Sequence, residues 1–381
     1  MKFIHLSDLH LGKKLGEFDL IEDQKYITDR IFDIIDSEKP DAVIIAGDIY
    51  DRGFPPLDAI NLFDDIIVRL AGKKIESFII SGNHDSAERN AFANRLIDLS
   101  GIHLSSVYNG NVKPLTLKDS HGEVNFWMLP FIKPATVRNF FPDEEIASYT
   151  DAVKVAVKNM NADFSSRNIL IAHQFVTGSE RCDSEDVSVG GSDNVDAAAF
   201  DGFDYVALGH LHGAQSAGRE TIRYCGTPLK YSLSEINHEK SVTVVEIGEK
   251  DDVKIRTVPL APMRDIVEIT GSYNEIISQE FSSKLKKDDF YKFILTDEEN
   301  IVNVMNRVRT VYPNVIKIDY THAQTVRAAE FSSDQNVGNL SMLDNFKNFY
   351  RSVKGEELSE RQTAYLTALI EKIEEEENET A

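Results

Sequence analysis

Seven side chains that can bind metal ions occupy one kind of position in this sequence, directly after a short apolar segment. Each of those segments has the length and composition of a buried strand. The candidate ligands are Asp8, His10, Asp48, Asn83, His173, His210 and His212. Carboxylate, imidazole and amide groups together suit borderline divalent ions such as Mn, Fe or Zn, and do not suit calcium.

Two such ions, about 3.5–4 Å apart, can clamp both the attacking and the leaving oxygen of a phosphate ester. This arrangement needs a carboxylate that both ions share, and Asp48 is the natural candidate. His84 lies between Asn83 and Asp85 on a predicted tight turn, where it could help the departing oxygen. Asp51 could hold the ring of His84 in orientation. The pattern therefore predicts two-metal phosphoesterase chemistry.

The elements that must position these residues alternate between strand and helix in the first third of the chain. Apolar residues at helical spacing predict helices over 20–37 and about 56–71, and apolar runs predict strands at 42–46 and 77–80. Strands separated by helices indicate an α/β layered fold. Open α/β sheets place their sites at the carboxyl ends of strands, so we expect the seven ligands to meet there.

The character of the sequence changes after about residue 262. Residues 265–320 have the pattern strand, helix, strand, helix, strand, which predicts a small α+β module. A mostly polar stretch follows and then two apolar helical stripes. We therefore expect four parts, namely a phosphoesterase domain at 1–262, a capping domain at 263–321, a linker at 322–340 and a helical partner-binding segment at 341–381.

The composition limits the possible partners. The chain of 381 residues has a net charge of −22, which argues against broad non-specific adhesion to nucleic acid. Nucleic acid remains possible as a substrate, because metal-binding carboxylates inflate the negative count and a basic partner could compensate. We find no apolar run of about 18 residues and no secretory signal. With two cysteines, Cys182 and Cys225, we expect a cytoplasmic protein without disulfides or a membrane span.

Five motifs in a fixed order resemble the calcineurin-like metallophosphoesterase family. They are Asp8-Leu9-His10, Gly47-Asp48-Ile49-Tyr50-Asp51, Gly82-Asn83-His84-Asp85, His173, and Gly209-His210-Leu211-His212. The resemblance implies a layered β-sandwich flanked by helices, and two divalent ions, expected to be Mn²⁺. It also implies the ligand sets and places His84 in catalysis. One ion would be held by Asp8, His10, Asp48 and His212, and the other by Asp48, Asn83, His173 and His210.

Longer strings resemble one branch of that family, the bacterial nuclease subunits of the SbcD type. They lie at residues 4–12, 188–193, 203–210 and 224–228. The resemblance implies that the capping domain helps to admit DNA, that the protein is a homodimer, and that the terminal helices bind an SbcC-type coiled-coil ATPase. One departure is Gly213-Ala214, where a basic residue and proline are expected, and it puts a nearby DNA contact in doubt.

Several weaker candidates have two interpretations each. A basic group near the first motifs could meet DNA phosphates or lie in solvated loops, and it consists of Lys13, Lys14 and Arg89. An aromatic stripe after the linker could bind the partner or pack in a core, and it consists of Phe346, Phe349 and Tyr350. His84 could merely stabilise its turn, and Asp51 could be a loop carboxylate paired with Arg52. We interpret Asp85 as holding the turn and His5 as a satisfied core histidine.

The predicted site and domains are compatible with three functions. The leading hypothesis is a Mn-dependent DNA nuclease, a double-strand exonuclease and single-strand or hairpin endonuclease within an ATP-driven complex for repair, replication or recombination. The second is a phosphatase or nucleotide phosphodiesterase that acts on small molecules and needs neither the cap nor the terminal helices. The third is a non-catalytic scaffold, which is disfavoured because such proteins usually lose ligands and none is missing here.

Overall fold

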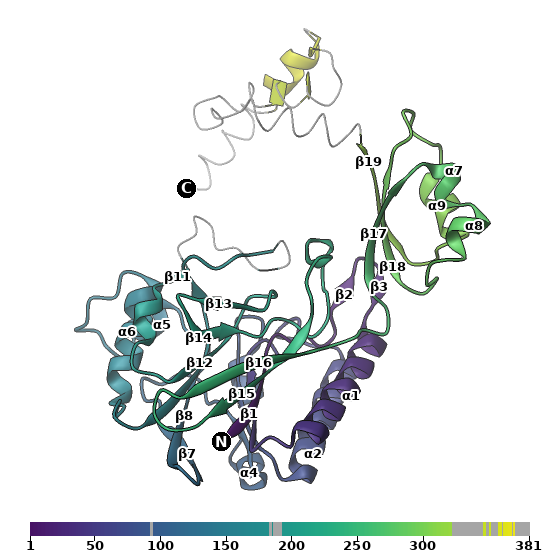
Figure 1. Cartoon of the computed structure of the whole chain (residues 1–381). Helices are drawn as coiled ribbons and strands as arrows, with labels where there is room; N and C mark the ends of the chain where they lie inside the picture. The colour runs from purple at the N-terminus through teal and green to yellow at the C-terminus, as the bar shows by residue number, and fades with distance from the viewer. Residues whose placement is uncertain are drawn as a thin grey trace. The chain divides into compact units, whose positions relative to one another are not determined.

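The computed structural model describes residues 1–91, 94–182, 185, 193–321, 346–347, 350–351, 357–359, 361–367 and 369. The chain forms two compact units (Figure 1). The first unit comprises Met1–Glu268 with Lys286–Tyr291, and the second comprises Ile269–Leu285 with Lys292–Ala381. Phe349 and the expected linker at 322–340 lie outside the described residues.

One six-stranded sheet of the first unit carries the strands that precede the first three motifs. Its strands, in spatial order, are β16 (Val253–Pro259), β15 (Ser241–Ile247), β1 (Lys2–Leu6), β4 (Ala42–Ala46), β5 (Glu76–Ile80) and β6 (Ile102–Leu104). The run from β1 to β6 is parallel, whereas β15 is antiparallel to both of its neighbours. The carboxyl ends of β1, β4 and β5 therefore lie at the same edge.

The other six-stranded sheet carries the strands that precede the last two motifs. Its strands, in spatial order, are β13 (Gln215–Ala217), β14 (Arg219–Tyr224), β12 (Tyr205–Gly209), β9 (Arg167–His173), β8 (Gly122–Leu129) and β7 (Pro114–Asp119). The four central strands are parallel, and β13 and β7 form antiparallel edges. The pairing of Gly209 with His173 brings the ends of β12 and β9 level.

The core lies between the two sheets. Alternate residues of each strand point into it, such as Ala42, Ile44 and Ala46 of β4, and Phe78 of one sheet stacks on Phe126 of the other with ring centroids 4.2 Å apart. The remaining residues of β4 are also buried, because a central parallel strand is covered on both faces. The predicted α/β sandwich is confirmed.

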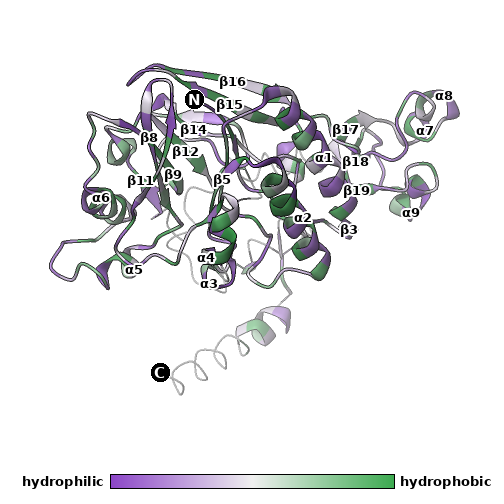
Figure 2. Cartoon of the chain, turned by 90° about the horizontal axis from the view of Figure 1, so that it is seen from below, coloured by the Kyte–Doolittle hydropathy of each residue, from purple (hydrophilic) through white to green (hydrophobic). Residues whose placement is uncertain are grey.

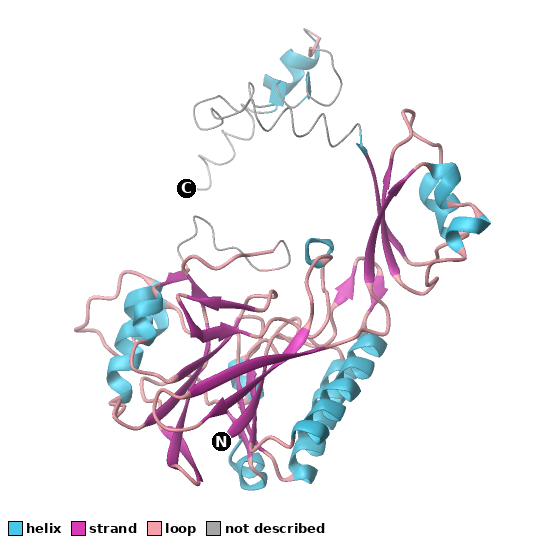
Figure 3. Ribbon diagram, viewed as in Figure 1, coloured by secondary structure: helices cyan, strands magenta, loops and turns pink. Residues whose placement is uncertain are grey.

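Amphipathic helices cover the outer faces of the sheets (Figure 3). Helix α1 (Ile21–Glu38) and helix α2 (Leu57–Lys73) bury one face each, and in Figure 2 both carry green apolar and purple polar stretches. Both helices begin and end within two residues of the predicted ranges. On the other side, α6 (Tyr149–Met160) packs on the sheet of β9 and β12 and begins with a capping box between Ser148 and Asp151.

Short elements complete the first unit. They are the hairpin β2 (Lys14–Leu15) and β3 (Phe18–Asp19), the pair β10 (Phe175–Val176) and β11 (Asn194–Val195), the helices α3 (Ala87–Asn90), α4 (Asn94–Ile97) and α5 (Pro134–Arg138), and the 3-10 turns η1 (Asp98–Ser100), η3 (Ala197–Phe200) and η4 (Leu233–Glu235).

The second unit is built around most of a three-stranded sheet. Its elements, in chain order, are β17 (Ile266–Gly271), α7 (Tyr273–Ile276), α8 (Gln279–Ser282), β18 (Phe290–Leu295), α9 (Val304–Arg309) and β19 (Val315–Tyr320), with the first residues of β17 and β18 belonging to the first unit. The strands lie in the order β17-β18-β19. The predicted domain boundaries after 262 and 321 stay a prediction. None of the described helices combines the length and the apolar character that crossing a membrane requires.

His5 of β1 connects the two sheets. Its Nδ1 lies 2.9 Å from the hydroxyl of Tyr205 on β12, and burial lowers the pKa of His5 to about 3, with the charge of Arg223 adding to the shift. The unfolded chain therefore binds a proton that the folded chain excludes. The contribution of the neutral His5 side chain to the free energy of unfolding is therefore fully present above the unfolded pKa of about 6.5. It is lost as the pH falls towards the folded pKa of about 3.

We predict that His5→Gln flattens this acid dependence. In metal-free protein, the free energy of unfolding from urea titrations should fall less for His5→Gln than for the wild type between pH 7 and pH 4.5. The difference reaches at most about 1.4 kcal/mol per pH unit. The exposed His121, replaced by Gln, is the control and should behave like the wild type. Equal losses in all three proteins would contradict the buried, neutral state of His5.

Candidate metal centre

Five strand ends deliver the seven predicted ligands to one place. The first sheet contributes the loops after β1, β4 and β5, and the second contributes the ends of β9 and β12. The carboxylate of Asp8 accepts a hydrogen bond from the backbone N–H of His210 at 2.9 Å, although 202 residues separate them. The predicted ligands therefore converge from opposite sheets.

The backbone at these strand ends is unusual. Four of the seven predicted ligands have a positive φ, namely Asp8 (53°), His10 (42°), Asp48 (49°) and His210 (105°). Such conformations are uncommon outside glycine and concentrate at functional sites. Gly47, also at positive φ, has no room for a side chain, because a Cβ there would lie 2.4 Å from Nδ1 of His173. The glycines of the motifs thus permit the close approach of the ligand loops.

Asp48 lies at the middle of the cluster. Its Oδ2 is 3.2 Å from Nε2 of His173, 3.7 Å from Nε2 of His10 and 3.9 Å from Nε2 of His84. Its Oδ1 accepts a hydrogen bond from the backbone N–H of His84 at 2.9 Å. Asp8 and His173 each offer an atom within 4.8 Å of an Asp48 oxygen, as do His10 and His84. This position agrees with the expected role of a shared carboxylate.

Asn83 joins two of the predicted imidazole ligands. Its Oδ1 lies 3.0 Å from Nε2 of His173 and 3.0 Å from Nδ1 of His210. Nδ1 of His173 donates to the backbone carbonyl of Ala46 at 2.8 Å, which leaves Nε2 to face Asn83 and Asp48. An amide oxygen and two imidazole nitrogens thus point at one another, which is the geometry of ligands around a common ion.

His10 provides a direct test of whether these residues suit a metal. Both of its ring nitrogens are buried and have no hydrogen-bond partner among the described residues. Burying an imidazole without partners is costly unless something else satisfies it. The surrounding groups are carboxylates and further imidazoles, which are ligands of divalent cations, so a metal ion fits the site.

The charges of the site support the same conclusion. Burial alone would raise the pKa of Asp48, but the surrounding imidazoles, His173 first among them, hold it far below its usual range. Burial would lower the pKa of His173, but Asp48 raises it to about 9. Burial raises the pKa of Asp8 to about 6, with Asp48 adding to the shift, and it lowers that of His210 to about 3. The buried carboxylates thus depend on nearby positive charge.

His84 contacts Asp51 through the backbone of that residue. Nδ1 of His84 lies 3.0 Å from the backbone carbonyl of Asp51, not from its carboxylate. The carboxylate instead pairs with Lys13 at 2.7 Å. A carbonyl only accepts, so Nδ1 of His84 carries hydrogen and Nε2 faces the cluster. The two residues are thus in contact, and the orienting role of Asp51 stays a prediction.

The three predicted DNA-binding cations differ in their surroundings. Lys13 is engaged with Asp51, and Lys14 is exposed at the start of β2. Arg89 donates to the carbonyl of Gly53 at 2.9 Å, and its guanidinium lies 3.7 Å from the ring centroid of Phe54. Arg89 therefore has a structural contact of its own, and its role toward DNA stays a prediction.

Nothing in the sequence alone indicated that several further residues contact the predicted ligands. Gln24 of α1 ties down the loop after β1, since its amide donates to the carbonyl of His10 at 2.8 Å. Glu185 accepts from the backbone N–H of His212 at 2.7 Å, and Glu235 lies 3.1 Å from its Nδ1. Isolated Gln and Glu residues are common, so only the fold reveals that they lie against the ligands.

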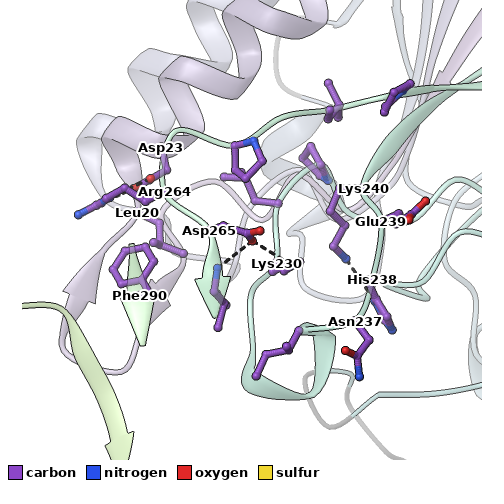
Figure 4. Close-up of a pocket in the computed structure, with 17 residues that line it drawn as sticks. Leu20, Asp23, Lys230, Asn237, His238, Glu239, Lys240, Arg264, Asp265 and Phe290 are labelled. Atoms are coloured by element: carbon purple, nitrogen blue, oxygen red, sulfur yellow. Dashed lines mark hydrogen bonds and ion pairs between the residues drawn. The ribbon is translucent and has the colours of Figure 1, made fainter. Parts of the chain in front are cut away.

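A cavity of about 460 Å³ lies elsewhere in the first unit (Figure 4). Two ion pairs line it, one between Arg264 and Asp23 and one between Lys230 and Asp265 at 2.9 Å. None of the seven predicted ligands lines it, whereas Lys240 does. This cavity is therefore distinct from the predicted metal centre.

The described residues of the terminal segment form a groove of about 400 Å³. Phe346 and Tyr350 line it together with Leu358, Tyr365 and Leu366. Phe346 is 40% exposed, so this aromatic side chain is not sealed within a core. Phe349, the third predicted partner contact, lies outside the described residues.

Comparison with known proteins identifies the class. Residues 1–214, more than half of the chain, match the family described as calcineurin-like phosphoesterase. Residues 262–354 match a second family model, SbcD_C, described as type 5 capsule protein repressor C-terminal domain. The chain therefore belongs to the calcineurin-like phosphoesterase family, which implies divalent metal ions.

Full-length relatives narrow the class further. The SbcD subunit of the nuclease SbcCD from Staphylococcus epidermidis is 32% identical over 97% of this chain and 98% of its own length. A protein of the same name from Staphylococcus saprophyticus subsp. saprophyticus is 33% identical over 97% of this chain and 99% of its own length. The resemblance predicted from the motifs is confirmed, and it extends over both units.

The carboxylate of Asp85 connects two of the loops that carry predicted ligands. Its carboxylate accepts from the backbone N–H groups of Gly82 at 2.9 Å and of Ile49 and Tyr50 at 3.1 Å each. It thereby connects the loop of Asp48 to the loop of Asn83. Asp85→Ala would leave three partly buried donors unsatisfied, so we expect a loss of about 1–3 kcal/mol in the free energy of unfolding.

The measurement is urea unfolding with and without Mn²⁺. Asp85→Ala should lower stability in both conditions and also reduce the stabilisation that Mn²⁺ provides, because the two ligand loops lose their register. Glu88→Ala, a substitution three residues away, is the control. An Asp85→Ala protein as stable as the control would show that the three hydrogen bonds contribute little.

Proposed function

We propose that this chain is a Mn²⁺-dependent DNA nuclease that cleaves duplex ends as an exonuclease and single strands or hairpins as an endonuclease. The observation that carries the proposal is the gathering of the predicted ligands from five strand ends, with Asp48 and Asn83 in contact with imidazoles from both sheets. Membership of the phosphoesterase family makes the chain a phosphodiester hydrolase. DNA is inferred from the full-length similarity to nuclease subunits.

The ligands divide into two sets that share Asp48. One ion would be held by Asp8, His10, Asp48 and His212, and the other by Asp48, Asn83, His173 and His210. The contacts of Asn83 with both His173 and His210 support the second set. When bound, such ions supply Lewis acidity and neutralise the charge that develops on the phosphate. We propose Mn²⁺ because the mixed carboxylate and imidazole donors suit a borderline ion.

We propose that His84 moves a proton, and its contacts support this role. Its Nδ1–H donates to the carbonyl of Asp51 at 3.0 Å, which fixes the ring, and its Nε2 lies 3.9 Å from Oδ2 of Asp48 on the side of the cluster. The side chain is 17% exposed, so substrate can reach it. A protonated Nε2 can donate to the oxygen that leaves phosphorus, which is general acid catalysis. We assign this role to His84 and ring positioning to Asp51.

Two partners are proposed besides DNA. Exposed apolar side chains occur on three elements that pack beside β6, namely α2, α4 and η1. They include Leu57 (69% exposed), Leu96 (73%) and Leu99 (85%). Large apolar side chains left exposed suit a protein interface, so we propose a homodimer contact through these helices. The second partner is an SbcC-type coiled-coil ATPase, bound through the terminal segment, in a cytoplasmic complex that acts in repair, replication or recombination.

The central experiment compares the wild type with His84→Ala on end-labelled duplex, hairpin and single-stranded DNA in the presence of Mn²⁺. We expect cleavage to fall by about 10²–10⁴-fold, the usual contribution of a positioned acid. Mn²⁺ binding, measured by calorimetry, should remain, because His84 is outside both ligand sets. A p-nitrophenyl phosphodiester serves as the small-molecule control substrate.

Two outcomes would overturn parts of this proposal. Unchanged DNA cleavage by His84→Ala would remove His84 from the chemistry. Wild-type activity on the small ester alone, with no cleavage of any DNA, would favour a small-molecule phosphodiesterase over a nuclease.

Removal of residues 341–381 tests the ATPase contact. The shortened chain should lose binding to the SbcC-type partner in a pull-down, while Mn²⁺-dependent hydrolysis of the small phosphodiester stays within about twofold of the wild type. The reason is that all seven proposed ligands lie before residue 213. A shortened chain that still captures the partner would show that the contact lies elsewhere.

A further inference from the structure

Glu235 is a buried carboxylate that lies against one of the proposed metal ligands. It ends the turn η4 and has no exposed surface. Its Oε1 lies 3.1 Å from Nδ1 of His212 and accepts from the backbone N–H of Tyr231 at 3.3 Å. A buried carboxylate requires compensating contacts, because removing its charge from water costs several kcal/mol.

Lys240 compensates the charge of Glu235. Its Nζ lies 2.6 Å from Oε2 of Glu235, and it also donates to the backbone carbonyl of His212 at 2.9 Å and to Oγ1 of Thr227 at 2.7 Å. The lysine is only 8% exposed, and its ammonium satisfies three acceptors at once. Glu235 is therefore fixed from both of its oxygens, one by the imidazole and one by the lysine.

The contact determines which nitrogen of His212 remains available. A carboxylate only accepts hydrogen bonds, so the hydrogen of the neutral ring lies on Nδ1, facing Glu235. Nε2 then keeps its lone pair, which a metal ion needs. Metal-binding histidines commonly donate their other N–H to a carboxylate, which fixes the ring and raises its basicity. Lys240 fixes the same residue a second time, through its backbone carbonyl.

A different interpretation is a further metal site, because Cys182, His212 and Glu235 offer ligand atoms within 4.8 Å of one another. The position of Lys240 argues against it. Its ammonium already provides a positive charge 2.6 Å from Glu235, and a divalent ion beside it would be repelled at close range. The cluster is thus better explained as a support for His212 than as a site of its own.

We propose that Glu235 is a positioning residue of the metal centre, which holds the His212 ring so that Nε2 faces a divalent ion, while Lys240 holds Glu235 in place. This inference rests on the proposed function, since it takes His212 to be a ligand. Loss of Glu235 should weaken only the ion that His212 holds, whereas the ion held by Asn83, His173 and His210 should keep its affinity.

The test is a Mn²⁺ titration of the full chain followed by calorimetry. The wild type should bind two ions. Glu235→Ala should bind one ion with wild-type affinity and the other about 10–100-fold more weakly, the usual effect of losing such a support. Glu235→Gln keeps the size and an acceptor oxygen but loses the charge, so its loss should be smaller. Glu239→Gln, an exposed neighbour, is the matched control and should behave like the wild type.

The outcomes separate this inference from the metal centre itself. Glu235→Ala with two ions at wild-type affinity would overturn the positioning role, as would an equal weakening of both ions in the folded Glu235→Gln protein. A third ion that disappears in Cys182→Ser would establish the alternative metal site instead.

A wild-type chain that binds fewer than two ions would overturn the proposed centre, and the inference with it. Circular dichroism of each variant checks the fold, and Glu235→Gln decides if Glu235→Ala unfolds.

Discussion

The close approach of the two sheets at the ends of β4, β9 and β12 is the constraint on which the rest of the structure depends. Nδ1 of His173 donates to the carbonyl of Ala46 at 2.8 Å, so the end of one sheet is bonded to the end of the other. A Cβ on Gly209 would lie 1.9 Å from that same carbonyl oxygen. Any larger residue there would separate the sheets and pull the ligand loops apart, which explains why glycine precedes the ligands at these positions.

The same close approach concentrates charge where water cannot screen it. Asp8 and Asp48 are buried among imidazoles, and each carboxylate alone would be expensive to hold there. Backbone N–H groups relieve part of that cost, as in the bond from His210 to Asp8. The surrounding layer of Asp85, Glu235 and Lys240 fixes the loops and rings whose donor atoms face inward. The cluster thus suits cations, and residues outside the predicted ligand set contact its loops and rings.

The site could be predicted from the sequence where a metal-binding residue type follows an apolar strand. It could not be predicted where only the fold brings residues together. The strand at 42–46 was predicted to the residue, and the motifs identified the family that the comparisons confirm. The ligand assignments agree with the geometry but remain predictions. The carbonyl of Asp51, the support by Glu235 and the pairing of Lys13 could not be predicted, because they depend on contacts between loops of different strands. Backbone atoms in particular carry no signal of residue type.

The contact between Asp8 and His210 also bears on how the protein is made. Ligands of both proposed ions lie at the beginning of the chain and 202 residues later, so neither ion has a complete set while the chain is only partly synthesised. The support for His212 emerges later still, with Glu235 and Lys240. A ribosome-bound fragment that ends after β6 holds only Asp8, His10, Asp48 and Asn83 of the proposed ligands. The proposed centre is therefore complete only near the end of translation of the first unit, and we expect shorter fragments to be inactive.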